Sequence, residues 1–258
     1  MDLMTPLSSI APGLDSAALT VLAGADTAMS ATQIQRVAGR GSRYGLVLVL
    51  ERLAQHGLVT AIPAARGNLY QLKREHILAP VVIAAVSARA EMNRRLSEAL
   101  RALSPKPLSA AIYGSVARGE ATSDSDIDLL VITTDGVDPD DEIWTRQIDN
   151  LERQARLWTG NLLQVVTVPR AQLVAMSAAG ANIVTEWERD AQTIYGQDVR
   201  RLIHAIQRNT PVSSEPLGDI VGQVPDDATL CDREEVAMDA GLLHVGSATW
   251  SRDELHAR

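Results

Sequence analysis

Two aspartates separated by a single residue, Asp126 and Asp128, stand at the start of an apolar run that covers residues 129–132. Successive side chains on a β-strand point to opposite faces, so both carboxylates would project from one face while their apolar neighbours enter the core. Two adjacent carboxylates repel each other. A hard divalent cation such as Mg²⁺, held by carboxylate oxygens together with substrate phosphates, would neutralise the pair. The spacing therefore predicts a Mg²⁺ site at the start of a strand.

A Gly-Ser pair precedes the acids, at Gly114 and Ser115, directly after a predicted strand at 110–113. The backbone N–H groups of such a turn and the serine hydroxyl can bind phosphate oxygens. The alternative is a polar surface loop followed by an edge strand whose acids are simply solvated. Aspartate is disfavoured in strands, and two on one face are rarer still, so we favour a site for phosphate and metal.

Gly114-Ser115, a spacer of ten residues and then Asp126-Ile127-Asp128 resemble the signature of the nucleotidyltransferase superfamily of the DNA polymerase β type. The neighbouring sequences Ala-Arg-Gly-Glu at 117–120 and Ser-Asp-Ser-Asp at 123–126 resemble the bacterial minimal nucleotidyltransferases in particular. Relatives of this kind occur in toxin–antitoxin and antibiotic-resistance systems. We therefore expect a small nucleotidyltransferase domain with a mixed β-sheet flanked by helices.

The resemblance implies transfer of a nucleoside monophosphate from an NTP, such as ATP, to an acceptor, with pyrophosphate leaving. Two Mg²⁺ ions would position the reactants and neutralise the charge that develops. The catalytic residues and metal ligands would be Asp126 and Asp128. The nucleotide would be bound by Gly114, Ser115 and Arg118. The acceptor, which could be a protein, an RNA such as tRNA or a small molecule, is encoded by no motif in this chain.

The sequence departs from this family at one point. Such enzymes usually carry a third carboxylate on the next long strand, here predicted at 162–168, and its one polar interior candidate is Gln164. An amide cannot accept a proton as a carboxylate does, and it binds Mg²⁺ weakly. Three explanations are open. Glu120 in the loop before the acid pair takes the place of the third carboxylate, the acceptor needs no strong base, or the activity is reduced or lost.

The first third of the chain resembles a winged helix-turn-helix of bacterial regulators. Apolar spacing predicts helices at 14–23, 30–38 and 42–56, and a hairpin follows at 58–72. In such a domain the third helix enters the major groove of DNA with its N-terminal residues. The residues expected to contact DNA are Arg40, Ser42, Arg43, Tyr44 and Arg66. The alternative is that the fold serves dimerisation or protein docking, and a homodimer on a two-fold site suits DNA binding better than a monomer.

These patterns divide the chain into four parts. We expect a winged helix-turn-helix at 1–76, a connecting helix at 77–104, a minimal nucleotidyltransferase domain at 105–208 and an acidic, disordered tail at 209–258. In the catalytic part, a helix at 141–158 would turn Ile143, Ile148, Leu151 and Ala155 inward. The fold class is therefore α/β (α+β).

The composition sets further bounds. The net charge of −8 is uneven, because residues 1–75 carry seven Lys/Arg against five Asp/Glu, whereas residues 211–258 carry three Arg against ten acids. Only the N-terminal part is thus locally basic enough to bind nucleic acid. The single cysteine, Cys231, fits a reducing compartment, and no signal peptide or membrane span is evident, so we expect a cytoplasmic protein.

Besides a pure protein-interaction module, which would leave the paired aspartates unexplained, two functions compete at this point. The first is a metal-dependent nucleotidyltransferase coupled to a DNA-binding module. The Gly114-Ser115 and Asp126-x-Asp128 pattern favours this function. The second is a catalytically weak or inactive transcriptional regulator, resembling an antitoxin, that keeps the fold for nucleotide sensing or partner binding. Gln164 and the basic N-terminal part favour the second.

Overall fold

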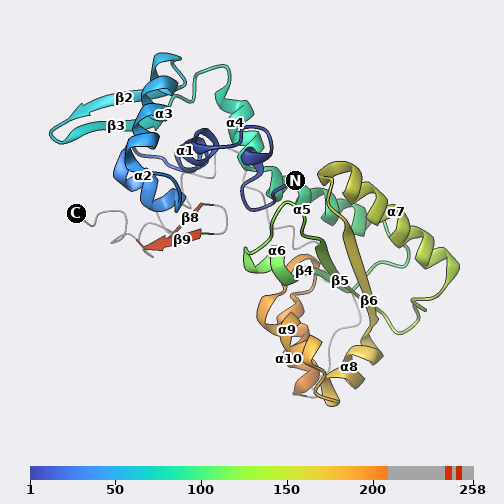
Figure 1. The fold of residues 1–258 in the computed structure, drawn as a ribbon. Helices are drawn as coiled ribbons and strands as arrows, with labels where there is room; N and C mark the ends of the chain where they lie inside the picture. The colour runs from blue at the N-terminus through green and yellow to red at the C-terminus, as the bar shows by residue number, and fades with distance from the viewer. Residues whose placement is uncertain (209–241, 246–247, 252–258) are drawn as a thin grey trace. The chain divides into compact units, whose positions relative to one another are not determined.

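The computed structural model describes residues 1–208, 242–245 and 248–251. Residues 2–208 divide into two compact units, which we call the N-terminal unit (residues 2–89) and the C-terminal unit (residues 90–208). The mixed α/β class predicted from the sequence is confirmed (Figure 1). The disorder expected for the acidic tail concerns 209–241, 246–247 and 252–258, which lie outside the described residues. Within the tail, β8 (Leu242–Val245) pairs with β9 (Ala248–Ser251) in antiparallel fashion.

The N-terminal unit is built from short helices and a three-stranded antiparallel sheet of order β1-β3-β2. Its elements are η1 (Pro6–Ser9), α1 (Leu14–Ala23), β1 (Met29–Ser30), α2 (Ala31–Ala38), α3 (Arg43–Gln55), β2 (Val59–Ala64), β3 (Gly67–Leu72) and α4 (Ala79–Val86). Leu22, Ile34, Leu46 and Leu50 are fully buried and join α1, α2 and α3 around one core.

Local hydrogen bonds and one glycine fix both ends of α2 and the start of α3. Ser30 and Gln33 form a capping box at the start of α2, in which the Ser30 N–H donates to Oε1 of Gln33 at 2.8 Å. Gly39 ends α2 in the left-handed region, at φ +64°. The Ser42 hydroxyl then accepts a hydrogen bond from the Gly45 N–H at 3.0 Å and starts α3. The sequence thus specifies both ends of the turn.

The connecting segment differs from the single helix expected at 77–104. It consists of two helices, α4 and α5 (Ala88–Arg101), which are separated at Ser87. Ala79 and Val82 of α4 pack into the core of the N-terminal unit. The apolar side of α5, which includes Leu96, belongs instead to the C-terminal unit. The break is consistent with two helices that serve different cores.

The C-terminal unit contains a four-stranded mixed sheet of order β6-β5-β4-β7. β5 is parallel to β6 and antiparallel to β4, and β4 is antiparallel to β7. Following α5, its elements are β4 (Ser109–Tyr113), α6 (Gly114–Arg118), β5 (Ile127–Thr133), α7 (Glu142–Thr159), β6 (Leu163–Pro169), α8 (Arg170–Ala178), α9 (Asn182–Asp190), β7 (Gln192–Gly196) and α10 (Val199–Gln207).

Helices cover both faces of this sheet. α8, α9 and α10, which lie together in Figure 1, pack against Leu130 and Ile132 of β5 and Val168 of β6. The neighbouring Thr167 points to the opposite face, where its hydroxyl accepts a hydrogen bond from the indole N–H of Trp144 in α7 at 3.1 Å. Because side chains alternate, Asp128 lies on the same face of β5 as Leu130 and Ile132, but nearer the start of the strand.

The inward face of α7 corrects one prediction. Ile143 is 64% exposed, whereas Trp144 is buried together with Ile148, Leu151 and Ala155. Asp141 caps the helix by accepting hydrogen bonds from the N–H groups of residues 143 and 144. The buried set repeats at helical spacing when counted from Trp144, so the apolar stripe begins one residue later than we predicted.

No helix in the described part of the chain combines the length and the apolar character that a membrane crossing requires.

Candidate functional site

Three polar residues from neighbouring chain segments meet at one end of the sheet in the C-terminal unit. Asp128 is the second residue of β5, Asp126 directly precedes that strand, and Gln164 is the second residue of β6. In the strand register Asp128 stands beside Gln164 on one side and opposite Tyr113 of β4 on the other. The paired acids and the amide, which the sequence places 36 residues and more apart, therefore lie together.

Gln164 contacts the acid pair directly. Its side-chain amide Nε2 donates a hydrogen bond to Oδ2 of Asp126 at 2.5 Å, and the residue is exposed. The amide group stands where the resemblance implied a third carboxylate. Within the described residues, no cluster of three or more His, Cys, Asp or Glu side chains is placed to hold a metal ion. The oxygen donors of this site are thus two carboxylates and one amide.

Gly114 lies against the Asp128 carboxylate, and the Gly114-Ser115 pair forms the start of a short helix rather than a simple turn. Gly114 has φ +68°, a conformation that residues with a Cβ rarely adopt. A Cβ added there would meet Oδ2 of Asp128 at 2.3 Å. Close approach of this backbone to the Asp128 carboxylate therefore requires glycine. The same segment is stabilised by the Glu120 N–H, which donates to the Ser115 carbonyl at 2.9 Å.

The electrostatics of the acid pair follow from this crowding. Burial raises the pKa of Asp128, the negative charge of Asp126 raises this pKa further, and the positive charge of Arg118 opposes both effects. Burial likewise raises the pKa of Tyr113, and Asp128 adds to the rise. The Asp128 carboxylate thus stands in a negative environment, and a bound cation would stabilise its ionised form.

The chemistry of the donor set suits magnesium. Mg²⁺ is commonly bound through one or two carboxylates, with substrate phosphates and water completing the shell. Asp126 and Asp128 supply two carboxylates close enough for their charges to interact, and the Gly114 backbone lies beside Asp128, where a phosphate could bind. The pair therefore fits a divalent cation that a triphosphate helps to bind.

Arg118, the third residue expected to bind the nucleotide, forms two ion pairs. Its Nε donates to Glu120 at 2.8 Å, and its Nη1 donates to Oδ2 of Asp190, at the end of α9, at 2.9 Å. Glu120, considered as a substitute base, is therefore engaged by this guanidinium. Asp190 was missed at the sequence level, because it stands 72 residues away and no motif singles it out.

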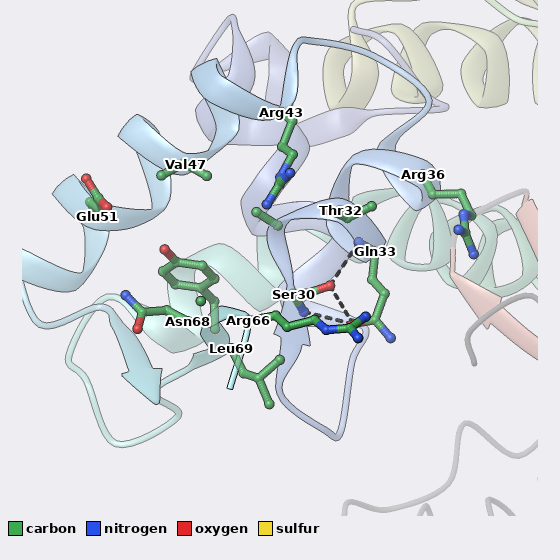
Figure 2. Close-up of a pocket in the computed structure, with 13 residues that line it drawn as sticks. Ser30, Thr32, Gln33, Arg36, Arg43, Val47, Glu51, Arg66, Asn68 and Leu69 are labelled. Carbon is green, nitrogen blue, oxygen red and sulfur yellow. Dashed lines mark hydrogen bonds between the residues drawn. The ribbon is translucent and has the colours of Figure 1, made fainter. Parts of the chain in front are cut away.

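A second candidate site lies in the N-terminal unit, between α2, α3 and β3. It is a groove of about 720 Å³, shown in Figure 2. Arg43 of α3 and Arg66 of the β2–β3 turn extend into it, and Glu51 lies further along α3 (Figure 2). Neither of these arginines forms an ion pair with another described residue. The lining residues are Ser30, Ala31, Thr32, Gln33, Arg36, Arg43, Val47, Glu51, Arg66, Gly67, Asn68, Leu69 and Tyr70.

The five residues expected to contact DNA differ in whether their side chains line the groove, are exposed outside it or bind other parts of the N-terminal unit. Arg43 and Arg66 line the groove, and Tyr44, outside it, is 73% exposed. Ser42 uses its hydroxyl to cap α3. Arg40 reaches back to α1, where its Nη2 donates to the Ser16 hydroxyl at 2.9 Å and more weakly to the Gly13 carbonyl. The structure therefore brings two of the five together in one groove.

Comparison with known proteins finds a family match within the C-terminal unit. Residues 93–190 match the family model described as "Nucleotidyltransferase domain". This range contains β4, α6, β5, α7, β6, α8 and α9, and with them both aspartates, the Gly-Ser pair and Gln164. The match supports nucleotidyl transfer as the activity of this unit, and it does not extend to the N-terminal unit.

Other comparisons are remote. No curated protein matches the chain. Among solved structures, a toxin–antitoxin crystal structure with AMP-PNP is 15% identical, with a TM-score of 0.33, and covers 57% of this chain and 97% of its own. A crystal structure of a mutant of the toxin–antitoxin MntA-HpeT is 14% identical, with a TM-score of 0.34 and the same coverage of both chains. At these TM-scores neither likeness bears on the activity of this chain.

Proposed function

We propose that the chain is a Mg²⁺-dependent nucleotidyltransferase that moves a nucleoside monophosphate from an NTP to an acceptor. An acceptor oxygen attacks the α-phosphorus, the new P–O bond forms, and the bond to the β-phosphate breaks so that pyrophosphate leaves. When the acceptor is a hydroxyl, its proton passes to a base or to water. The acceptor is a protein, an RNA or a small molecule.

One observation supports this proposal above the others. The carboxylates of Asp126 and Asp128 lie close enough at the start of β5 for their charges to interact, and the Gly114 backbone approaches Asp128 so closely that a Cβ would collide with it. A purely structural loop would not require this approach, whereas a site in which backbone N–H groups bind phosphate beside metal-binding carboxylates would. The family match over 93–190 supports the same conclusion.

Each residue has a role in this proposal. Asp126 and Asp128 would hold the metal, for which we propose two Mg²⁺ ions. When bound, the metal supplies charge neutralisation at the phosphates. The Gly114 and Ser115 N–H groups and the Ser115 hydroxyl bind phosphate oxygens. Arg118 contributes positive charge at the site, since its guanidinium lowers the pKa of Asp128.

We further propose that the N-terminal unit is a winged helix that binds DNA. Its order of helices, a tight α2–α3 turn and a β2–β3 hairpin is that of such modules. Arg43 and Arg66 are then the principal contacts, Tyr44 adds an exposed contact on α3, and Ser42 and Arg40 shape the turn between α2 and α3. A homodimer on a two-fold DNA site would supply the affinity that a single module lacks.

The hydrogen bond from Gln164 to Asp126 favours a second function. An amide at this position cannot act as a general base, so the C-terminal unit could bind an NTP without transferring it. The protein would then be a transcriptional regulator, akin to an antitoxin, in which nucleotide binding alters DNA binding.

Label transfer distinguishes the two functions. The protein is incubated with Mg²⁺, cell lysate as a source of acceptors, and ATP, CTP, GTP or UTP labelled at the α-phosphate. Transfer that disappears in an Asp126→Ala/Asp128→Ala variant supports the enzyme, and the labelled product identifies the acceptor class. Binding of NTP without transfer supports the regulator, and a shift of promoter DNA that responds to NTP would then be expected. Absence of both binding and transfer contradicts the proposal.

A further inference from the structure

Asp190 is a buried charged group that the proposed chemistry does not use. Its side chain is only 5% exposed, and it ends α9 just before β7. Its neighbour Arg189 donates two hydrogen bonds to it, at 2.6 and 2.8 Å. Arg118, the last residue of α6, donates a further one at 2.9 Å. These hydrogen bonds hold the pKa of Asp190 well below its usual range, so the carboxylate is charged at neutral pH.

A second hydrogen bond joins the same two segments. Nε2 of Gln192, the first residue of β7, donates to the carbonyl of Ala117 at 2.6 Å. This carbonyl belongs to the final turn of α6, where backbone acceptors have no partner within a helix. Two consecutive residues of α6, Ala117 and Arg118, are therefore held by two side chains from the short stretch 190–192.

These contacts act on the phosphate segment, because α6 has only five residues. It begins at Gly114, in contact with the Asp128 carboxylate, and it ends at Arg118, bound to Asp190. Any movement of its last turn would therefore displace the Gly114 and Ser115 N–H groups relative to the acid pair. A displacement of about 1 Å in the groups that position a substrate can lower the reaction rate by about 100-fold.

We infer that Asp190 and Gln192 are positioning residues that hold the Gly114–Arg118 segment against the acid pair and thereby set the affinity for the triphosphate. Asp190 acts through Arg118, and Gln192 acts through the Ala117 carbonyl. Neither touches the reacting atoms. The effect on the triphosphate rests on the proposed function, whereas the effect on the segment itself does not.

The chain offers a matched control for Asp190. Arg189 binds the same carboxylate, but it is 63% exposed, adjacent in sequence and forms no hydrogen bond with the described residues of α6. Arg189→Gln therefore removes a partner of Asp190 and leaves the connection to Arg118. Asp190→Asn keeps the size of the side chain and removes its charge.

Two measurements on the full chain test the inference. In the free protein, hydrogen exchange of the amides of residues 114–120 is expected to rise in Asp190→Asn and Gln192→Ala and to stay unchanged in Arg189→Gln. With α,β-methylene-ATP and Mg²⁺, which cannot undergo the transfer, the Kd is expected to rise about tenfold in Asp190→Asn, the effect of one charge-assisted hydrogen bond. The Kd of the double variant Arg118→Gln/Asp190→Asn should be no higher than that of the single variant that binds more weakly.

The outcomes separate this inference from the proposed function. Unchanged exchange at 114–120 in folded Asp190→Asn overturns the inference, and so do additive effects of Arg118→Gln and Asp190→Asn on the Kd. If the hydrogen exchange rises in the variants but the wild type binds no nucleotide, the proposed function fails. The inferred effect on triphosphate affinity then fails with it, whereas the anchoring of α6 by Asp190 and Gln192 is supported. Thermal unfolding of each variant verifies that it is folded at the temperature of the assay.

Discussion

The side-chain amide of Gln164 donates a hydrogen bond to Oδ2 of Asp126 from the adjacent strand. Gln164 is also the register partner of Asp128, so it stands beside both acids. The amide partly compensates the negative charge of the pair in the absence of a cation. It also places a group with no basic oxygen at the point where a carboxylate could accept a proton.

Gln164→Glu is therefore expected to increase nucleotidyl transfer. A carboxylate beside Asp126 and Asp128 supplies a base and a further metal ligand, and general-base catalysis contributes on the order of 10²-fold. The measurement is the initial rate of label transfer at saturating NTP and Mg²⁺. Gln164→Leu is the control, because it has a similar size and neither accepts a proton nor binds metal. A rate for the glutamate variant no higher than that of the leucine variant would contradict a base-limited site.

Asp128→Asn is expected to stabilise the protein when no divalent cation is present. Because burial and Asp126 raise the pKa of Asp128 in the folded state, the charged carboxylate costs stability at pH 7. That cost disappears as the pH falls through the raised pKa, and both states are protonated well below the ordinary value of 3.8. The Tm of the variant should therefore exceed that of the wild type at pH 7 in EDTA, and the gap should narrow on acidification.

Asp124→Asn is the matched control for this experiment, because it removes a carboxylate from the exposed loop just before the pair. Its Tm should equal that of the wild type. Addition of Mg²⁺ with NTP should raise the Tm of the wild type and leave that of Asp128→Asn nearly unchanged, since a ligand stabilises only the state that binds it. A lower Tm for Asp128→Asn in EDTA would show that the carboxylate is needed for folding instead.

Local patterns predicted much of the C-terminal unit. The alternation after Asp126 predicted β5, and the apolar stretch at 162–168 predicted β6 with Gln164 on it, because strand and turn preferences act between near neighbours. The contacts that complete the site are of another kind. The hydrogen bond from Arg118 to Asp190 joins residues 72 positions apart, and only the packing of α9 beside α6 brings them together.

The N-terminal unit shows the same limit. Its helices were predictable from apolar spacing alone. The direction of Arg40 was not, because whether an arginine faces a partner molecule or its own fold depends on which acceptors α1 presents. Similarly, an alanine-rich stretch gives no local signal for the break at Ser87, which is consistent with the separate cores served by α4 and α5.

Gly114→Ala is expected to reduce both stability and nucleotide binding. At φ +68° a side chain costs about 1–2 kcal/mol, and the added Cβ would lie 2.3 Å from the Asp128 carboxylate, so the segment or the acid must move. Thermal unfolding and label transfer check the two effects. Gly136→Ala is the control, because a Cβ at Gly136 meets no atom within 4 Å. Equal behaviour of the two variants would refute the close approach.

Arg43→Ala and Arg66→Ala are expected to weaken DNA binding through lost phosphate contacts. Each phosphate contact that is removed should make the plot of log K against log salt concentration less steep by about 0.9. The slopes can be compared directly as long as both variants fold like the wild type. The measurement is a titration of DNA from the region upstream of the protein's own coding sequence at several salt concentrations. Arg74→Ala is the control, since Arg74 lies outside the groove and pairs with Asp26 at 3.5 Å. If the folded wild type binds this DNA no better than random duplex and all slopes agree, the groove does not serve sequence-specific DNA binding. A protein segment would then be the more reasonable occupant.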